Sequence, residues 1–136
     1  MAYAHSRNPE GVRQDLVAHL RAVSDLAGEF GARLGAGDAA RLLGLWHDLG
    51  KFHPDFQRYL LDSEAGVSPR RRGPDHKAAG ASLAARQVGA LALLIQGHHG
   101  GLKSPSEFKA WLAEHAGPAV DEALRRAQQA IPGLVP

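Results

Sequence analysis

The chain contains no cysteine among its 136 residues. Disulfide bonds, thiolate metal ligands and a cysteine nucleophile are therefore excluded, and any metal site must use nitrogen and oxygen donors. The N-terminus carries no apolar run of the signal-peptide type. The longest strongly apolar stretch, residues 88–95, is shorter than a bilayer span requires. We therefore expect a cytoplasmic protein with no membrane partner.

Net charge is also small, at +2, in a chain that is 44% hydrophobic and 22% charged. These values are typical of a single globular domain, here residues 1–136, and do not by themselves indicate nucleic-acid binding. The basic residues Arg70, Arg71 and Arg72 nevertheless form a run inside the polar segment 62–74, which we expect to be a loop. Arginines in such a loop either contact the phosphates of a single strand or are simply solvated.

Strand-like alternation of apolar and polar residues is lacking, and the periodicity is helical throughout. The sequence therefore predicts an all-α bundle. The expected helices cover about residues 10–34, 38–49, a short stretch after residue 54, 76–88, 90–98, a stretch from residue 105, and 118–130. In the first helix Leu16, Leu20, Val23, Ala27 and Phe30 form one apolar stripe. We expect both tryptophans, Trp46 and Trp111, in the core because leucines flank them at helical spacing.

Histidine is the residue type that the sequence has in excess, with eight copies. His19 lies on the inner face of the first helix, and His47-Asp48 ends the second helix before Gly50. His76 opens a later helix, and His98-His99 end the next one. A lone histidine on an apolar face is more often a core residue than a ligand, but here four segments bring imidazoles to helix ends or inner faces. Imidazole is the commonest nitrogen donor for transition metals, so these residues could fill two metal sites.

The other three histidines have simpler interpretations. We expect His5 to be structural, His53 to be a surface or supporting residue in a turn before Pro54, and His115 to be solvated on its helix. None of the three is predicted to bind a metal ion.

Several sequence strings resemble one family. They are Ala4-His5-Ser6, AHL around His19, HDLGKFHPDFQRYL from His47, DHKAAGA from Asp75 and GHHGGL from Gly97. Their order resembles the HD superfamily of metal phosphohydrolases. More narrowly, the pair Phe56-Gln57 and the double histidine resemble the HD nuclease domain of the CRISPR-associated helicase-nuclease of type I interference. The resemblance covers roughly residues 4–102.

The resemblance implies a centre of two divalent metal ions, with Asp48 bridging them. His19 and His47 would bind one ion, and His76, His98 and His99 the other. Asp48 and Lys51 would be the catalytic residues, with Lys51 neutralising the phosphate. Manganese, iron, cobalt, nickel and zinc all suit such donors. The family also uses a later acidic ligand, for which Asp121 is a weak candidate, so the domain could lack a C-terminal part.

The implied function is cleavage of single-stranded DNA in antiviral type I CRISPR interference, as an endonuclease or an exonuclease. The partners would be a CRISPR-associated helicase and the type I surveillance complex. No G-x-x-x-x-G-K-[ST] loop occurs in this sequence, so the helicase would be a separate chain or a part absent from this one. One alternative is an HD phosphohydrolase acting on nucleotides or cyclic nucleotides, favoured by a cleft that residues 62–74 close. Another is a metal-free HD-like docking module.

Overall fold

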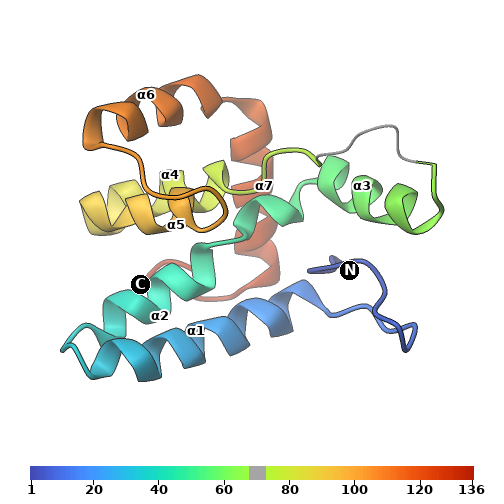
Figure 1. Cartoon of the computed structure of the whole chain (residues 1–136), viewed down its shortest axis with the longest axis horizontal. Coiled ribbons are helices and arrows are strands. Elements are labelled where there is room, and N and C mark those ends of the chain that lie inside the picture. The colour runs from blue at the N-terminus through green and yellow to red at the C-terminus, as the bar shows by residue number, and fades with distance from the viewer. Residues whose placement is uncertain (68–72) are drawn as a thin grey trace.

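The computed structural model describes residues 1–67 and 73–136, and the described chain folds as a bundle of helices without strands (Figure 1). The predicted all-α class is confirmed. The elements in chain order are α1 (Leu16–Ala32), α2 (Gly37–Trp46), the 3-10 helix η1 (Leu49–Phe52), α3 (Pro54–Glu64), α4 (Ala78–Val88), the 3-10 helix η2 (Gly89–Ala92), α5 (Leu93–Gly97), α6 (Pro105–His115) and α7 (Pro118–Ala130).

Helix α1 begins at Leu16, later than the sequence predicted. The Asp15 side chain accepts a hydrogen bond from the Ala18 N–H at 2.9 Å and so caps the helix. Tyr3 forms an isolated antiparallel bridge with Asp15, which holds the preceding segment in an extended conformation. The helical boundary is therefore set by a contact with the N-terminus, a long-range feature that local periodicity does not report.

Helices α1 and α2 form an antiparallel hairpin along one side of the molecule (Figure 1). They approach closely at glycines: a β-carbon on Gly44 would lie 2.9 Å from the Cα of Ser24. The predicted apolar stripe is correct at Leu16 and Leu20, both fully buried, but wrong at Phe30, which is 60% exposed. The face of α1 that packs on α2 instead contains Gly28, which is buried.

The end of α2 lies against the start of α4, and two glycines allow this contact. A β-carbon on Gly80 would overlap the backbone carbonyl of Trp46, and one on Gly50 would overlap the backbone of His76. The Gly50 N–H also donates to the His76 carbonyl at 3.2 Å. Only residues without a β-carbon let the backbone of one segment approach the other so closely. This packing brings the segments that carry His47-Asp48 and His76 together.

The segment Ala78–Gly97 is apolar and long enough to pass for a membrane span by composition, with a mean hydropathy of 1.5. This window is longer than the residues 88–95 considered from the sequence. The α-helix is interrupted at Gly89, which has φ 60°, and 44% of the window is buried inside the protein. Ala81, Ala84 and Ile95 are among its core residues. Part of the segment thus packs in the protein core.

The C-terminal helices follow the predicted local signals. Ser104 caps α6 by accepting from the Glu107 N–H at 3.2 Å, and its hydroxyl donates to the Glu107 carboxylate at 2.9 Å.

The Trp46 side chain is completely buried and donates to the Leu134 carbonyl at 2.9 Å, so its predicted core position is confirmed. Trp111 packs against the core but is only half-buried.

Candidate metal centre

Four imidazoles from separate segments surround the carboxylate of Asp48, whose side chain is 5% exposed. The nearest distances from each Nε2 to an Asp48 oxygen are 3.7 Å for His19, 3.2 Å for His47, 3.5 Å for His76 and 3.3 Å for His98. His19 and His47 face Oδ2, whereas His76 and His98 face Oδ1. Each carboxylate oxygen therefore has its own pair of imidazoles.

The possible donor atoms fall into two groups that share Asp48. One group is His19, His47 and Asp48, and the other is Asp48, His76, His98 and His99. Within each group one donor atom from every residue lies within 4.8 Å of the others. The structure therefore brings together all six residues that the sequence predicted as metal ligands, in the grouping that the resemblance implies. Their role as ligands stays a prediction.

The ends of short helices position these side chains. His47 is the C-cap of α2, Asp48 lies in the turn between α2 and η1, and His98 is the C-cap of α5. His76 precedes α4 instead of opening it, because Asp75 is the residue that caps the Ala78 N–H, at 2.9 Å. The ends of α2 and α5 and the segment before α4 thus meet at Asp48.

Hydrogen bonds fix the ring nitrogen that faces the carboxylate in two of the histidines. The Nδ1 of His47 lies 2.7 Å from the Gly44 carbonyl, and the Nδ1 of His98 contacts the Ile95 carbonyl. A carbonyl only accepts, so Nδ1 is the donor in both rings, and in the neutral form the Nε2 lone pair is left pointing at Asp48. Metal-binding histidines commonly have this arrangement, since the second nitrogen donates to a carbonyl or carboxylate.

Three buried polar atoms in the cluster have no hydrogen-bond partner among the described residues. They are Nε2 of His19, Nε2 of His76 and Oδ1 of Asp48. Unpaired polar atoms that are buried cost free energy, and lone pairs facing a carboxylate repel it. A cation in each of the two donor groups would satisfy these atoms, one beside His19 and the other beside His76 and Oδ1 of Asp48. The residues present thus fit a bound metal ion.

The pKa shifts of several residues in the cluster are consistent with a set of metal ligands. Burial lowers the pKa of His76 to about 4 and also lowers the pKa values of His19 and His99, so these rings stay neutral near neutral pH. Burial alone would raise the pKa of Asp48, but the nearby His47, His98 and Lys51 outweigh burial and hold that pKa well below its usual range. The site therefore offers the neutral nitrogens of His19, His76 and His99 beside an ionised carboxylate.

His47 behaves differently from its neighbours. Burial would lower its pKa, but the hydrogen bond and charge of Asp48 outweigh burial and raise the pKa. Because only the neutral ring can bind a metal through Nε2, a cation must displace this proton.

Lys51 is held inside the protein at the edge of the cluster. Its ammonium group lies 3.0 Å from Oδ2 of Asp48 and donates to the Ala4 carbonyl at 3.0 Å, with the side chain 6% exposed. Phe56 covers it, the ring centroid lying 5.6 Å from Nζ. The observed contacts orient Asp48, and the predicted role of Lys51 toward phosphate stays a prediction.

The N-terminal segment forms part of the wall of the site, which the sequence did not predict. The side-chain amide of Gln57 accepts from the Tyr3 N–H at 2.9 Å and donates to the Tyr3 and Lys51 carbonyls at 2.9 and 2.7 Å. The His5 ring lies edge-on to His19 with centroids 5.3 Å apart. The Phe56-Gln57 pair thus has a physical role, since Gln57 ties the first residues to the metal-site turn.

A cleft of about 860 Å³ opens beside the cluster. Residues of the cluster that line it are Lys51, His76 and His99. Its remaining walls include residues of the N-terminal segment, α3 and α6, among them His5, Tyr59 and Trp111. The cleft is open to solvent within the described part of the chain and therefore gives a substrate access to the cluster.

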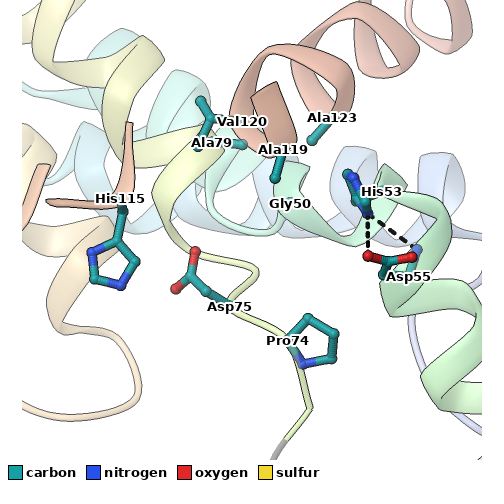
Figure 2. A pocket seen from close by; sticks show the side chains of 10 residues that line it. All are labelled: Gly50, His53, Asp55, Pro74, Asp75, Ala79, His115, Ala119, Val120 and Ala123. Atoms are coloured by element: carbon teal, nitrogen blue, oxygen red, sulfur yellow. Dashed lines mark hydrogen bonds and ion pairs between the residues drawn. The ribbon is translucent and has the colours of Figure 1, made fainter. Parts of the chain in front are cut away.

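A smaller pocket of about 190 Å³ lies next to the cleft and is shown in Figure 2. Its polar groups already have partners. His53 Nδ1 accepts from the Asp55 N–H at 3.1 Å, and Asp75 caps α4. His115 is half-buried, not solvated as predicted, because its Nδ1 bonds the Trp111 carbonyl at 2.9 Å. His53 supports the start of α3, as the sequence suggested, and none of these residues joins the two groups around Asp48.

The remaining predicted residues lie elsewhere. Asp121 is exposed in the first turn of α7 and belongs to neither group of donor atoms. Arg70, Arg71 and Arg72 fall outside the described residues, so their contact with a nucleic-acid backbone stays a prediction.

A helical bundle with a histidine–aspartate cluster at helix ends defines the class as a metal-dependent hydrolase of the HD type. Comparison with protein families identifies the particular one: residues 4–134 match the family described as "Cas3, HD domain". The chain belongs to this family of CRISPR-associated HD nucleases. The match confirms the resemblance and extends it beyond residue 102 into α6 and α7. A search of curated proteins found no match.

Proposed function

We propose that this domain cleaves single-stranded DNA in type I CRISPR interference, using two divalent metal ions held around Asp48. The observation that carries the proposal is the division of the cluster into two donor groups on the two oxygens of one carboxylate. Paired metal sites of this kind serve phosphoryl-ester hydrolysis, in which both the attacking and the leaving oxygen need stabilisation.

The protein residues have separate tasks in this proposal. Asp48 would contribute an oxygen to each ion, while His19 and His47 would hold one ion and His76, His98 and His99 the other. Lys51 holds Asp48 in place from inside the protein. When bound, the ions would activate water and stabilise the negative charge on phosphate. Manganese, iron, cobalt, nickel and zinc all fit the nitrogen and oxygen donors.

The shape of the cleft supports a polynucleotide over a mononucleotide as the substrate. Ligand pockets for small molecules bury most of the ligand surface. The cleft beside His76 and His99 is instead open to solvent within the described residues. A strand could therefore cross the cluster without its ends being enclosed.

The proposed partners follow from the family and the substrate. A helicase would supply the single strand by unwinding duplex DNA. The type I surveillance complex would direct the helicase and this domain to the target. Such a system acts against invading DNA in the cytoplasm.

The test is a hydrolysis assay with metal-loaded protein and three substrates: single-stranded DNA, duplex DNA and a cyclic nucleotide. Asp48→Asn is compared with Asp121→Asn, which makes the same chemical change at an exposed site outside both donor groups. We expect degradation of single-stranded DNA by the wild type and by Asp121→Asn, and loss of it in Asp48→Asn.

Other outcomes would reject the proposal. Hydrolysis of only the cyclic nucleotide would indicate a nucleotide phosphohydrolase. Absence of stoichiometric metal and of hydrolysis would indicate a docking module. Equal activity in Asp48→Asn and the wild type would place the chemistry away from this cluster.

A further inference from the structure

The wall of the cleft next to the metal centre carries a half-buried tryptophan. Trp111 lies on α6 and lines the same cleft as His76 and His99. From the sequence we expected a core residue, and one part of the side chain does pack against the core. The cleft-lining part is available to a ligand. The other tryptophan, Trp46, is completely buried and so is not available to a ligand.

A second ring packs on the first one. The His115 ring lies 4.6 Å from Trp111, centroid to centroid, with an interplanar angle of 31°. Its Nδ1 bonds the Trp111 carbonyl at 2.9 Å, which holds the imidazole in position. His115 also lines the cleft. The packed pair of rings is an aromatic surface on the cleft, supported by α6.

A positive charge accompanies the rings. The Lys77 ammonium lies 6.0 Å from the centroid of Trp111, and Lys77 lines the cleft next to His76 in the sequence. Lys77 makes no ion pair within the described part of the chain, whereas the ammonium group of Lys51 pairs with Asp48. Lys77 is therefore free to neutralise a phosphate near the metal centre.

We infer that Trp111, His115 and Lys77 form a binding subsite for one nucleotide of a single strand, next to the phosphodiester bond that is cut. An unpaired base stacks on the aromatic surface, and the adjoining phosphate contacts Lys77. Aromatic rings beside a cationic groove are how proteins bind single strands without reading sequence. The inference rests on the proposed nuclease function and adds the residues that bind its substrate.

Stacking also gives the cleft a preference for single strands over duplexes. Bases within a duplex are paired and stacked on one another, so their faces are not available to Trp111. Loss of the ring should weaken binding of a single strand by roughly 5- to 150-fold. Binding of small phosphodiesters that lack a base should not change.

Tryptophan fluorescence tests binding without the reaction. Metal-free protein is titrated with a thymidine oligonucleotide, and quenching by acrylamide is measured in parallel. Because Trp46 is buried, the accessible signal comes from Trp111. We expect the oligonucleotide to quench this signal and to protect it from acrylamide in the wild type. The effect should be absent in Trp111→Leu.

Kinetics with metal-loaded protein separate binding from chemistry. In Trp111→Leu we expect a raised KM for single-stranded DNA and little change in kcat. Trp111→Phe keeps a ring and should recover part of the affinity. Lys77→Met should reduce the salt dependence of binding by about 0.7 in log–log slope. Lys109→Met, on the exposed side of α6, is the control and should leave the slope unchanged.

The outcomes distinguish this inference from the proposed function. If the wild type cleaves single-stranded DNA while Trp111→Leu, Trp111→Phe and Lys77→Met bind it within twofold of the wild type, the subsite is overturned and the nuclease stands. If the wild type neither binds nor cleaves it, the proposed function fails first. Should Trp111→Leu not fold, the Trp111→Phe and Lys77→Met measurements decide.

Discussion

Lys51 and Asp48 form an ion pair with a separation of 3.0 Å, and both side chains are almost fully buried, at 6% and 5% exposed. The pair holds Oδ2, the carboxylate oxygen that also faces His19 and His47. The same ammonium group donates to the Ala4 carbonyl. One lysine therefore links the proposed bridging ligand to the N-terminal segment.

Replacing Lys51 with methionine should destabilise the metal-free protein. The change leaves the charge of Asp48 buried without its partner, which we expect to lower the free energy of unfolding by about 3 kcal/mol. Adding a divalent metal should recover part of the loss, because a cation next to Asp48 compensates the same charge. Urea denaturation with and without metal measures both effects. Lys109→Met, at an exposed site, is the control, and equal stability of the two variants would contradict the importance of the ion pair.

Gly80 lets α4 approach the end of α2, so Gly80→Ala should disturb the metal centre from outside it. The new β-carbon would overlap the Trp46 carbonyl, which is backbone and cannot rotate away. Overpacking of this kind costs about 3 kcal/mol, and it should separate His76 from Asp48 and weaken metal binding. Calorimetric metal titration and thermal denaturation are the measurements. Gln87→Ala, exposed on the same helix, should behave as the wild type. Unchanged metal affinity in Gly80→Ala would show that this close approach is dispensable.

The ion pair of Arg13 with Glu64 predicts a pH dependence of stability. A hydrogen bond from Arg13, 2.6 Å long, holds the pKa of Glu64 at about 2, below its ordinary value of 4.5. A lowered pKa in the folded state means that the pair stabilises the protein above pH 4.5 and loses its contribution as pH falls toward 2.

The stability difference between the wild type and Glu64→Gln should therefore be full near neutral pH and vanish in strong acid. Denaturation curves across this range measure it. Glu114→Gln, at an exposed site without an ion pair among the described residues, should show no such dependence. A constant difference between the wild type and Glu64→Gln at all pH values would contradict the pairing.

Features that depend only on residues close together in the chain were predictable from the sequence. The capping box at Ser104 and Glu107 uses side chains three positions apart, and it starts α6 as expected. The boundaries of α7 also follow from local signals. The candidate ligands could be named because histidine is in excess in this sequence and lies at predicted helix ends or inner faces. Their order along the chain carried the family resemblance.

Features that depend on tertiary contacts were not predictable. The start of α1 depends on the bridge between Tyr3 and Asp15, and Phe30 is exposed because α2 packs on a different face of α1. Trp111 has the same flanking pattern as a core residue, and only the position of α6 puts its ring on the cleft. The contacts of the buried Lys51 ammonium group with Asp48 and the Ala4 carbonyl are also tertiary, and its role toward phosphate stays a prediction.

If one buried carboxylate and the surrounding imidazoles hold two cations, anomalous diffraction from zinc-loaded crystals should reveal both. We predict two peaks about 3.5–4 Å apart, each roughly 2.0–2.2 Å from an oxygen of Asp48. One peak should contact His19 and His47, and the other His76, His98 and His99. No anomalous peak within coordination distance of Asp48 would contradict the account.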